Sequence, residues 1–455
     1  MFDQRGNPVS TTSADALAHA EHALWQMMSF YGTPLDALDA AAAADPAWAL
    51  PKLMKAGFLL SLTEPALLVD ARAELAIAES TPSHANQRER AHAAALRTLL
   101  AGDWHGACRD WEALLLQHPC DALALQWAHL FDFYRGDALN LRQRVARVLP
   151  EWSDADPLHP YVLGQYAFGL EENQRYDEAE AAGRRALAGS ARVPWAIHAV
   201  AHVMEMQGRH AEGGAWMARW QPDWTDGNGF AGHLGWHQAL FALETLDHAE
   251  ALRCFDAHLA AGPAQITLQR LDAAALLWRL HLLGAEVGPR WQRLAAGWDL
   301  SEQHAGYYAF NDLHALLALI GSGDIAGAET WAQHCASIAE ASTGSNRETA
   351  REVGAPLMRG MLAFARGRGD DAIEALYPVR AKAQRFGGSH AQRDLIDQTL
   401  LAAAAGASVA EHRAVGRALL NERRLAKPPT PLTEYWARRL GLRHTAAHRV
   451  GPWGA

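Results

Sequence analysis

Apolar residues recur along the chain at the three- and four-residue spacing of amphipathic helices, and the alternating pattern of β-strands is nearly absent. Gly-Asp and Gly-Arg steps interrupt this pattern at Gly102, Gly136, Gly208 and Gly323. The first two lie 34 residues apart. Because glycine followed by a capping residue is typical of a turn between helices, the pattern predicts a series of helical pairs joined by short turns.

The segment 161–194 shows the repeating unit most clearly, as two predicted helices within 34 residues. Its small residues return one period later, so that Ala167 is followed by Ala201 and Ala179 by Gly213. Small side chains at these positions allow paired helices to pack closely, and the period is that of the tetratricopeptide repeat. We therefore predict an all-α, tetratricopeptide-like, right-handed α-solenoid of about 10–11 helical hairpins.

The whole chain, residues 1–455, is predicted to form a single helical-repeat domain, because a repeat array grows in one dimension and needs no division at this length. Residues 1–12 form a polar lead and residues 13–425 the hairpins. Residues 426–455 form a proline-containing C-terminal segment with one last short helix.

Composition excludes several classes of function. The net charge of −10 argues against nucleic-acid binding, which requires a basic surface. No apolar run is long enough for a membrane span, and the N-terminal residues lack the apolar core of a secretory signal, so we expect a cytoplasmic protein. Walker, GxGxxG and GxSxG motifs are absent, and no nucleotide cofactor is expected. Oligomeric state is left open.

Polar side chains gather in two segments that are otherwise strongly apolar. His198, His202 and Glu205 are spaced i, i+4 and i+7, which places them on one face of a helix. His233 and His237 repeat the i, i+4 spacing in the next unit. We expect this face to line the inner surface of the solenoid.

Further polar groups follow in the C-terminal half. One group contains Asn311, Asp312 and His314, and another contains Gln392, Arg393 and Asp394, while Asp272 and Arg279 stand in a mostly apolar stretch. Burying such groups costs free energy unless they are paired or bound to a ligand. Neighbouring units of a solenoid lie side by side, which allows these groups to converge; whether they form one site or two is left open.

Three interpretations of this cluster remain open. The two histidine pairs with nearby carboxylates suit a Zn, Mn or Fe ion, although His198-Ala199 departs from the HExxH signature. Without a metal, the histidines and carboxylates form an acid–base pocket in which Arg393 holds an anionic group. In the third interpretation the polar groups cross-link hairpins and have a structural role only.

The chain resembles the tetratricopeptide repeat protein 38 family. The resemblance is carried by HAVAHVMEMQGR (198–209), GHLGWHQALF (232–241), FNDLHALLAL (310–319) and GGSHAQRDLIDQTL (387–400), and it extends over about residues 20–425. It implies a non-standard tetratricopeptide superhelix and brings no established activity. The motifs coincide with the polar cluster, which favours that cluster as the working site.

We therefore predict an enclosed pocket that binds and transforms a small organic substrate, with metal-assisted or histidine-activated hydrolysis as the first reaction class to test. The candidate residues fall into three sets: catalytic His198, His202, Glu205, His237, Asp312 and His314; substrate-binding Trp236, Asn311, Gln392, Arg393 and Asp394; and metal-ligating His198, His202, His233 and His237. The alternative is a non-enzymatic scaffold that holds a peptide or protein partner in its concave groove.

Overall fold

The computed structural model describes residues 1–80, 85–260, 266–341 and 343–442, and in these residues the only β-structure is isolated bridges at Phe2–Pro8 and Tyr31–Asn228. The α-helices are α1 Ala14–Ser29, α2 Leu35–Ala44, α3 Leu50–Ser61, α4 Leu68–Glu79, α5 Gln87–Leu100, α6 Trp104–Gln117, α7 Ala122–Tyr134, α8 Ala138–Val148, α9 His159–Glu172, α10 Tyr176–Gly189, α11 Pro194–Met206, α12 His210–Trp220, α13 Ala231–Glu244, α14 His248–Cys254, α15 Thr267–Leu282, α16 Arg290–Ala295, α17 Ala309–Ser322, α18 Ile325–Ala341, α19 Ser345–Thr349, α20 Ala355–Ala365, α21 Gly369–Arg380, α22 His390–Ala405, α23 Ala410–Ala426 and α24 Pro431–Arg439.

Consecutive helices pack in pairs, from α1 with α2 up to α17 with α18, and then α20 with α21 and α22 with α23. Each pair also contacts a neighbouring pair, as α9 does with α11 and α21 with α22. Described residues thus contain eleven such hairpins, with α19 and α24 as additional short helices. The predicted all-α, tetratricopeptide-like array is confirmed.

The recurring Gly-Asp steps form the turns within hairpins, as predicted. Gly102, Gly136 and Gly323 have φ of 85°, 68° and 90°, in the left-handed region that glycine adopts without strain. The following aspartate then caps the next helix: the Asp103 carboxylate accepts a hydrogen bond from the Gly106 N–H at 2.7 Å, and Asp137 accepts one from Asn140 at 3.0 Å. One dipeptide therefore ends one helix and starts the next.

The predicted small residues lie where helices approach closely. Ala167, Ala179 and Ala201 are completely buried. At Gly213 a Cβ atom would stand 2.2 Å from the Phe241 ring, so no larger residue fits without repacking. Close approach within and between hairpins therefore depends on these positions.

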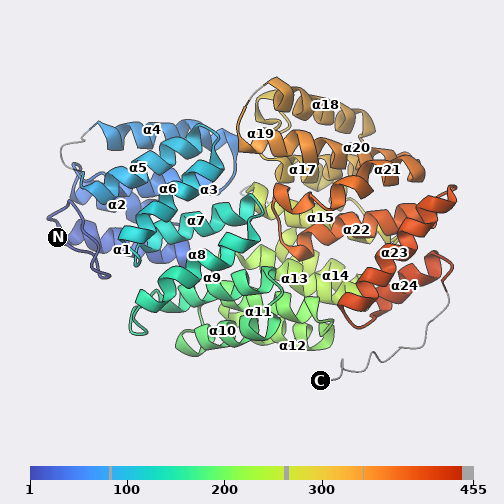
Figure 1. Ribbon diagram of the computed structural model, residues 1–455, viewed down its shortest axis with the longest axis horizontal. Coiled ribbons are helices and arrows are strands. Elements are labelled where there is room, and N and C mark those ends of the chain that lie inside the picture. The colour runs from blue at the N-terminus through green and yellow to red at the C-terminus, as the bar shows by residue number, and fades with distance from the viewer. Residues whose placement is uncertain (81–84, 261–265, 342, 443–455) are drawn as a thin grey trace.

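The array curves until its N-terminal third meets its C-terminal third, and Figure 1 shows α7 running towards the centre of the molecule, where the later helices begin. Hydrogen bonds join the two parts: the Tyr308 hydroxyl donates to the Tyr134 carbonyl at 2.8 Å, and the Asn311 amide donates to the Thr63 carbonyl at 3.1 Å. The inner face of the superhelix is therefore bridged and is not one continuous open groove.

The two ends of the described chain pack onto the array. In the N-terminal lead, the Ser10 hydroxyl donates to Glu89 of α5 at 2.6 Å. Thr430 follows Pro428 and Pro429 and caps α24, which is the last helix of the described residues. Of the predicted segment 426–455, residues 443–455 lie outside the described part of the chain. Within that part, no helix combines the length and apolarity that crossing a bilayer requires.

Candidate metal centre and adjoining cavity

Four histidines from two helices meet through the same ring nitrogen. His198 and His202 lie one turn apart on α11, and His233 and His237 lie one turn apart on α13. Nε2 of His198 is 2.8 Å from Nε2 of His202 and 3.0 Å from Nε2 of His233. Nε2 of His237 lies 3.3 Å from Nε2 of His233.

These separations are close to those around a bound metal ion. Four nitrogens at about 2.0–2.1 Å from a zinc ion in tetrahedral geometry are about 3.3 Å apart. The ligand atoms of all four histidines lie within 4.8 Å of one another. A metal would therefore require only small ring movements in this cluster.

Carboxylates stand behind three of the four rings, on the Nδ1 side. Asp272 of α15 lies 2.7 Å from Nδ1 of His233, which is a hydrogen bond. The remaining separations are longer, 3.5 Å from His237 Nδ1 to Glu205 and 3.7 Å from His202 Nδ1 to Glu171 of α9. A carboxylate that orients a histidine from the far side of its ring is the usual outer shell of a metal site.

Hydrogen bonds among neutral imidazoles do not satisfy this arrangement. A neutral ring carries one N–H, and His233 must place it on Nδ1 to donate to Asp272. Its Nε2 is then an acceptor that faces Nε2 of both His198 and His237. If His237 places its proton on Nε2 to donate there, its Nδ1 becomes an unprotonated nitrogen that faces the Glu205 carboxyl group 3.5 Å away without a hydrogen bond. A cation at the centre removes this conflict, because every Nε2 then offers a lone pair and every Nδ1 keeps its proton.

Burial shapes the electrostatics of the cluster. Removal from water lowers the pKa of His198, His202 and His237, so these rings are neutral, the state in which histidine binds a metal. Burial also raises the pKa of Glu205 to about 7 and raises that of Glu171. Neither oxygen of the Glu171 carboxyl group has a hydrogen-bond partner among the described residues.

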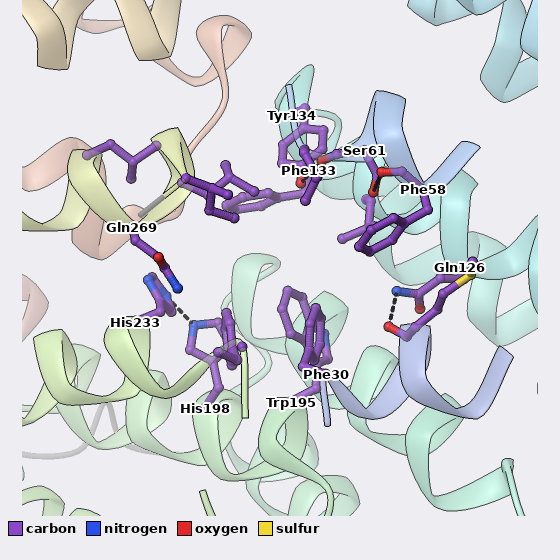
Figure 2. Close-up of a pocket in the computed structure, with 18 of the residues that line it drawn as sticks. Phe30, Phe58, Ser61, Gln126, Phe133, Tyr134, Trp195, His198, His233 and Gln269 are labelled. Carbon is purple, nitrogen blue, oxygen red and sulfur yellow. Dashed lines mark hydrogen bonds between the residues drawn. The ribbon is translucent and has the colours of Figure 1, made fainter. Parts of the chain in front are cut away.

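A cavity of about 280 Å³ adjoins the cluster, and both His198 and His233 line it. Figure 2 shows these two rings at one end, with the Gln269 amide directed at His233 from the opposite wall and Gln126 at the far end. Phe30 and Trp195 stack between the two ends with ring centroids 5.6 Å apart. The walls come from helices of all three thirds of the chain, among them α1, α3, α7, α11, α13, α15, α17 and α22.

Of the predicted substrate-binding residues, Gln392 lines this cavity, and its amide donates to Asp272 at 3.2 Å. Trp236 was expected to form an apolar wall, but its side chain is completely buried behind the histidines. Its ring stacks on His233 with centroids 5.3 Å apart, and the Arg279 guanidinium lies 5.5 Å from its centre. Trp236 therefore supports a histidine ring and is not among the described residues that line the cavity.

The other predicted residues occupy separate places. Asn311 and Asp312 line a small cavity near Thr63 and Trp331, while His314 points Nδ1 at the Phe310 carbonyl, 2.7 Å away. The four histidines and Gln392 therefore come together beside this cavity, whereas Asn311, Asp312 and His314 are not among the described residues that line it.

Arg393, Asp394 and Glu205 line a further cavity of about 490 Å³ whose charged groups largely pair with one another. Arg393 lies 3.3 Å from Glu172, and its guanidinium also donates to the Gly388 carbonyl. Asp394 accepts from Arg423, and its other oxygen accepts from Gln398 at 2.6 Å. Asp394 was predicted to bind substrate with Arg393, and its hydrogen-bond partners here are Arg423 and Gln398. Glu205 stands between this cavity and His237 of the histidine cluster.

Sequence patterns did not identify several residues of the centre as site residues. Asp272 stood out only as a charge in an apolar helix, and its partner His233 lies 39 residues earlier. Glu171 and Glu172 form an acidic pair at the end of a helix, and such a pair carries no site signal in the sequence. The cavity aromatics, such as Phe30 and Trp195, carry no signal beyond that of core residues.

Asp312 gives a prediction for stability. Burial raises the pKa of this carboxyl to about 7, although the Gly306 N–H, at 3.2 Å, and Arg347 act in the opposite direction. Between about pH 4 and pH 7 the folded chain then keeps a proton that the unfolded chain loses, so stability falls as pH rises through this range. We expect the free energy of unfolding of the parent to fall by on the order of a few kcal/mol between pH 5 and pH 8 because of this group, and we expect Asp312→Asn to remove that fall. Denaturant titrations of both proteins at the two pH values measure this difference; equal losses would contradict it.

No known protein-family profile matches the chain. Among solved structures, a tetratricopeptide repeat protein from Parabacteroides merdae ATCC 43184 is similar, with 14% identity, a TM-score of 0.31 and coverage of 69% of this chain and 98% of that one. The yeast protein Tom70 is similar with 10% identity, a TM-score of 0.32 and coverage of 94% and 88%. Both likenesses are too distant to bear on function, and the resemblance to the tetratricopeptide repeat protein 38 family remains a prediction from the sequence.

Proposed function

We propose that this protein holds a divalent transition-metal ion at His198, His202, His233 and His237, and that the centre acts on a small organic substrate in the adjoining cavity. One observation carries the proposal: three Nε2–Nε2 separations of 2.8–3.3 Å join the four rings in a chain, all four ligand atoms lie within 4.8 Å of one another, and three of the Nδ1 atoms face carboxylates. Imidazole ligands suit Zn and Fe, and carboxylates such as those behind the rings suit Mn, so Zn, Mn and Fe are the ions we expect.

The place of the centre beside the cavity supports a role in chemistry. His198 and His233 contribute to both the cluster and the cavity wall, so a bound ion would stand next to a ligand. An ion of octahedral preference keeps open positions beyond four histidines, whereas a tetrahedral zinc site with four protein ligands is closed. A metal with an open position activates water or polarises a carbonyl group, which makes hydrolysis the reaction class to test first.

Metal analysis of untagged protein tests the proposal. We expect about one equivalent of Zn, Mn or Fe in the parent and less than about a tenth in a His198→Ala/His237→Ala variant, because two of four ligands are lost. His129→Ala is the matched control: it removes another buried imidazole whose ring nitrogens have no side-chain partner, and it should keep the metal. A parent that stays metal-free after incubation with each ion would contradict the proposal.

The alternative is a scaffold that binds a peptide or protein partner. The fold by itself favours this function, since helical-repeat arrays commonly present extended concave surfaces. In this chain, however, contacts such as Tyr308 to Tyr134 and Asn311 to Thr63 bridge the inner face. Metal-free protein that binds extended peptides would support the scaffold, and metal that is lost only with the histidines would support the metal centre.

A further inference from the structure

The walls of the cavity beside the histidine cluster are mainly apolar and aromatic. Rings come from all three thirds of the chain: Phe30, Phe58, Phe133, Trp195, Phe230 and Phe310. Several polar groups on the walls already bond within the protein: the Ser61 hydroxyl donates to the Phe58 carbonyl at 2.7 Å, and the Tyr134 hydroxyl donates to the Ser61 carbonyl at 2.9 Å. A ligand therefore meets a surface that favours apolar groups.

Charge is nearly absent from this lining. None of the described residues that line the cavity is a lysine or an arginine, and Asp272 is their only carboxylate. Its two oxygens accept hydrogen bonds from His233 at 2.7 Å and from Gln392 at 3.2 Å. A charged ligand would lose its water on entering, and the one charged side chain on the described lining is Asp272, whose two oxygens already accept hydrogen bonds.

Uncharged polar groups mark the two ends of the cavity. At the far end, the Gln126 amide donates to the Met27 carbonyl at 3.3 Å and its oxygen accepts from Gln165 at 2.5 Å. At the histidine end, the amide of Gln269 is directed at His233 across the cavity (Figure 2). Recognition at the histidine end therefore relies on neutral hydrogen-bonding groups and on whatever ion the histidines hold.

We propose that the cavity binds an uncharged, mainly apolar organic molecule whose one polar group is directed at His198, His233 and Gln269. A volume of about 280 Å³ equals roughly nine water molecules at about 30 Å³ each, which corresponds to a ligand of about ten non-hydrogen atoms. This inference rests on the proposed function only in taking the cavity as the substrate site; it does not require the metal.

Three probes of equal chain length test it: 1-octanol, octanoate and octylammonium, titrated calorimetrically into the full-length protein at neutral pH. We expect 1-octanol to bind with a Kd at least about tenfold below that of either charged probe. Octanoate binding as tightly as 1-octanol would overturn the proposal in favour of anion recognition. Tighter binding of octylammonium would overturn it in favour of recognition by Asp272, and the absence of octanol binding would overturn it outright.

Variants place the binding in this cavity. Leu130→Trp and Leu268→Trp each fill space at a lining position and should abolish octanol binding, whereas Leu116→Trp on the exposed face of α6 should not change it. Thermal unfolding shows which variants fold, and two blocking positions keep the test valid if one fails. Octanol bound equally by the blocked and control variants would overturn the proposal.

Repeating the titration with His202→Ala/His237→Ala, which removes two of the four cluster histidines but no residue that lines the cavity, separates the two proposals. Octanol binding within about tenfold of the parent in this variant, with parent protein free of metal, would leave the cavity assignment standing and remove the metal centre. Metal present in the parent without octanol binding would leave the metal centre standing and remove the cavity assignment.

Discussion

Gly136→Ala is expected to cost about 2–5 kcal/mol of folding free energy, the sum of a left-handed backbone strain of about 1–2 kcal/mol and an overpacking cost of about 1–3 kcal/mol. The φ of Gly136 is 68°, and a Cβ there would stand 1.6 Å from the Gln384 carbonyl oxygen. The clash falls where the α7–α8 turn meets the C-terminal third, so the substitution would also loosen the closure of the superhelix. Denaturant titration measures the loss.

Gly102→Ala is the matched control for this prediction. Gly102 occupies the same Gly-Asp turn one repeat earlier with φ of 85°, but a Cβ there would meet nothing within 4 Å. This variant should lose only the folding free energy that the left-handed backbone strain costs, about 1–2 kcal/mol. If the two variants lost equal stability, the close contact between the two thirds of the chain would not exist in solution.

Asp272→Asn is expected to weaken metal binding about 10- to 100-fold, because outer carboxylates that orient histidine ligands have effects of this size. The asparagine keeps the shape of the side chain, but it loses the charge that faces Nδ1 of His233 at 2.7 Å. Competition with a chelator of known affinity measures the change in the apparent Kd. At a free metal concentration that nearly saturates the parent, the variant should also lose part of its ligand-dependent rise in Tm.

Asp312→Asn is a suitable control here, since Asp312 is an equally buried carboxyl that lies in a different cavity. It should leave the metal affinity unchanged. Equal weakening in both variants would mean that the loss follows general destabilisation and not the contact with His233. An unchanged affinity in Asp272→Asn would remove this carboxylate from the centre.

Closure of the superhelix connects these predictions to function. An open array would present its inner residues to a long partner, whereas the bridges near Tyr134 and Thr63 leave a cavity of about 280 Å³. The groups at one end of that cavity are the histidines of the cluster. Stability at the junction and ligand binding in the cavity are therefore expected to change together in Gly136→Ala.

Local patterns were enough to predict the helical array and the pairing of histidines on each helix. Helix periodicity is a property of neighbouring residues, so the i, i+4 spacing of His198 and His202 already places both on one face. The Gly-Asp turns are local as well, because a left-handed glycine and a capping carboxylate act within a few residues. Both features appear in the structure as predicted.

Tertiary structure alone decided which polar groups meet. The approach of α11 to α13 joins the two histidine pairs, and the packing of α9 and α15 brings Glu171 and Asp272 behind the rings. The same packing separates Asn311 and Asp312 from them, in a different cavity. The small rotation between successive repeats accumulates along a solenoid, so its curvature, its closure and the contacts across it depend on every interface and not on any single segment.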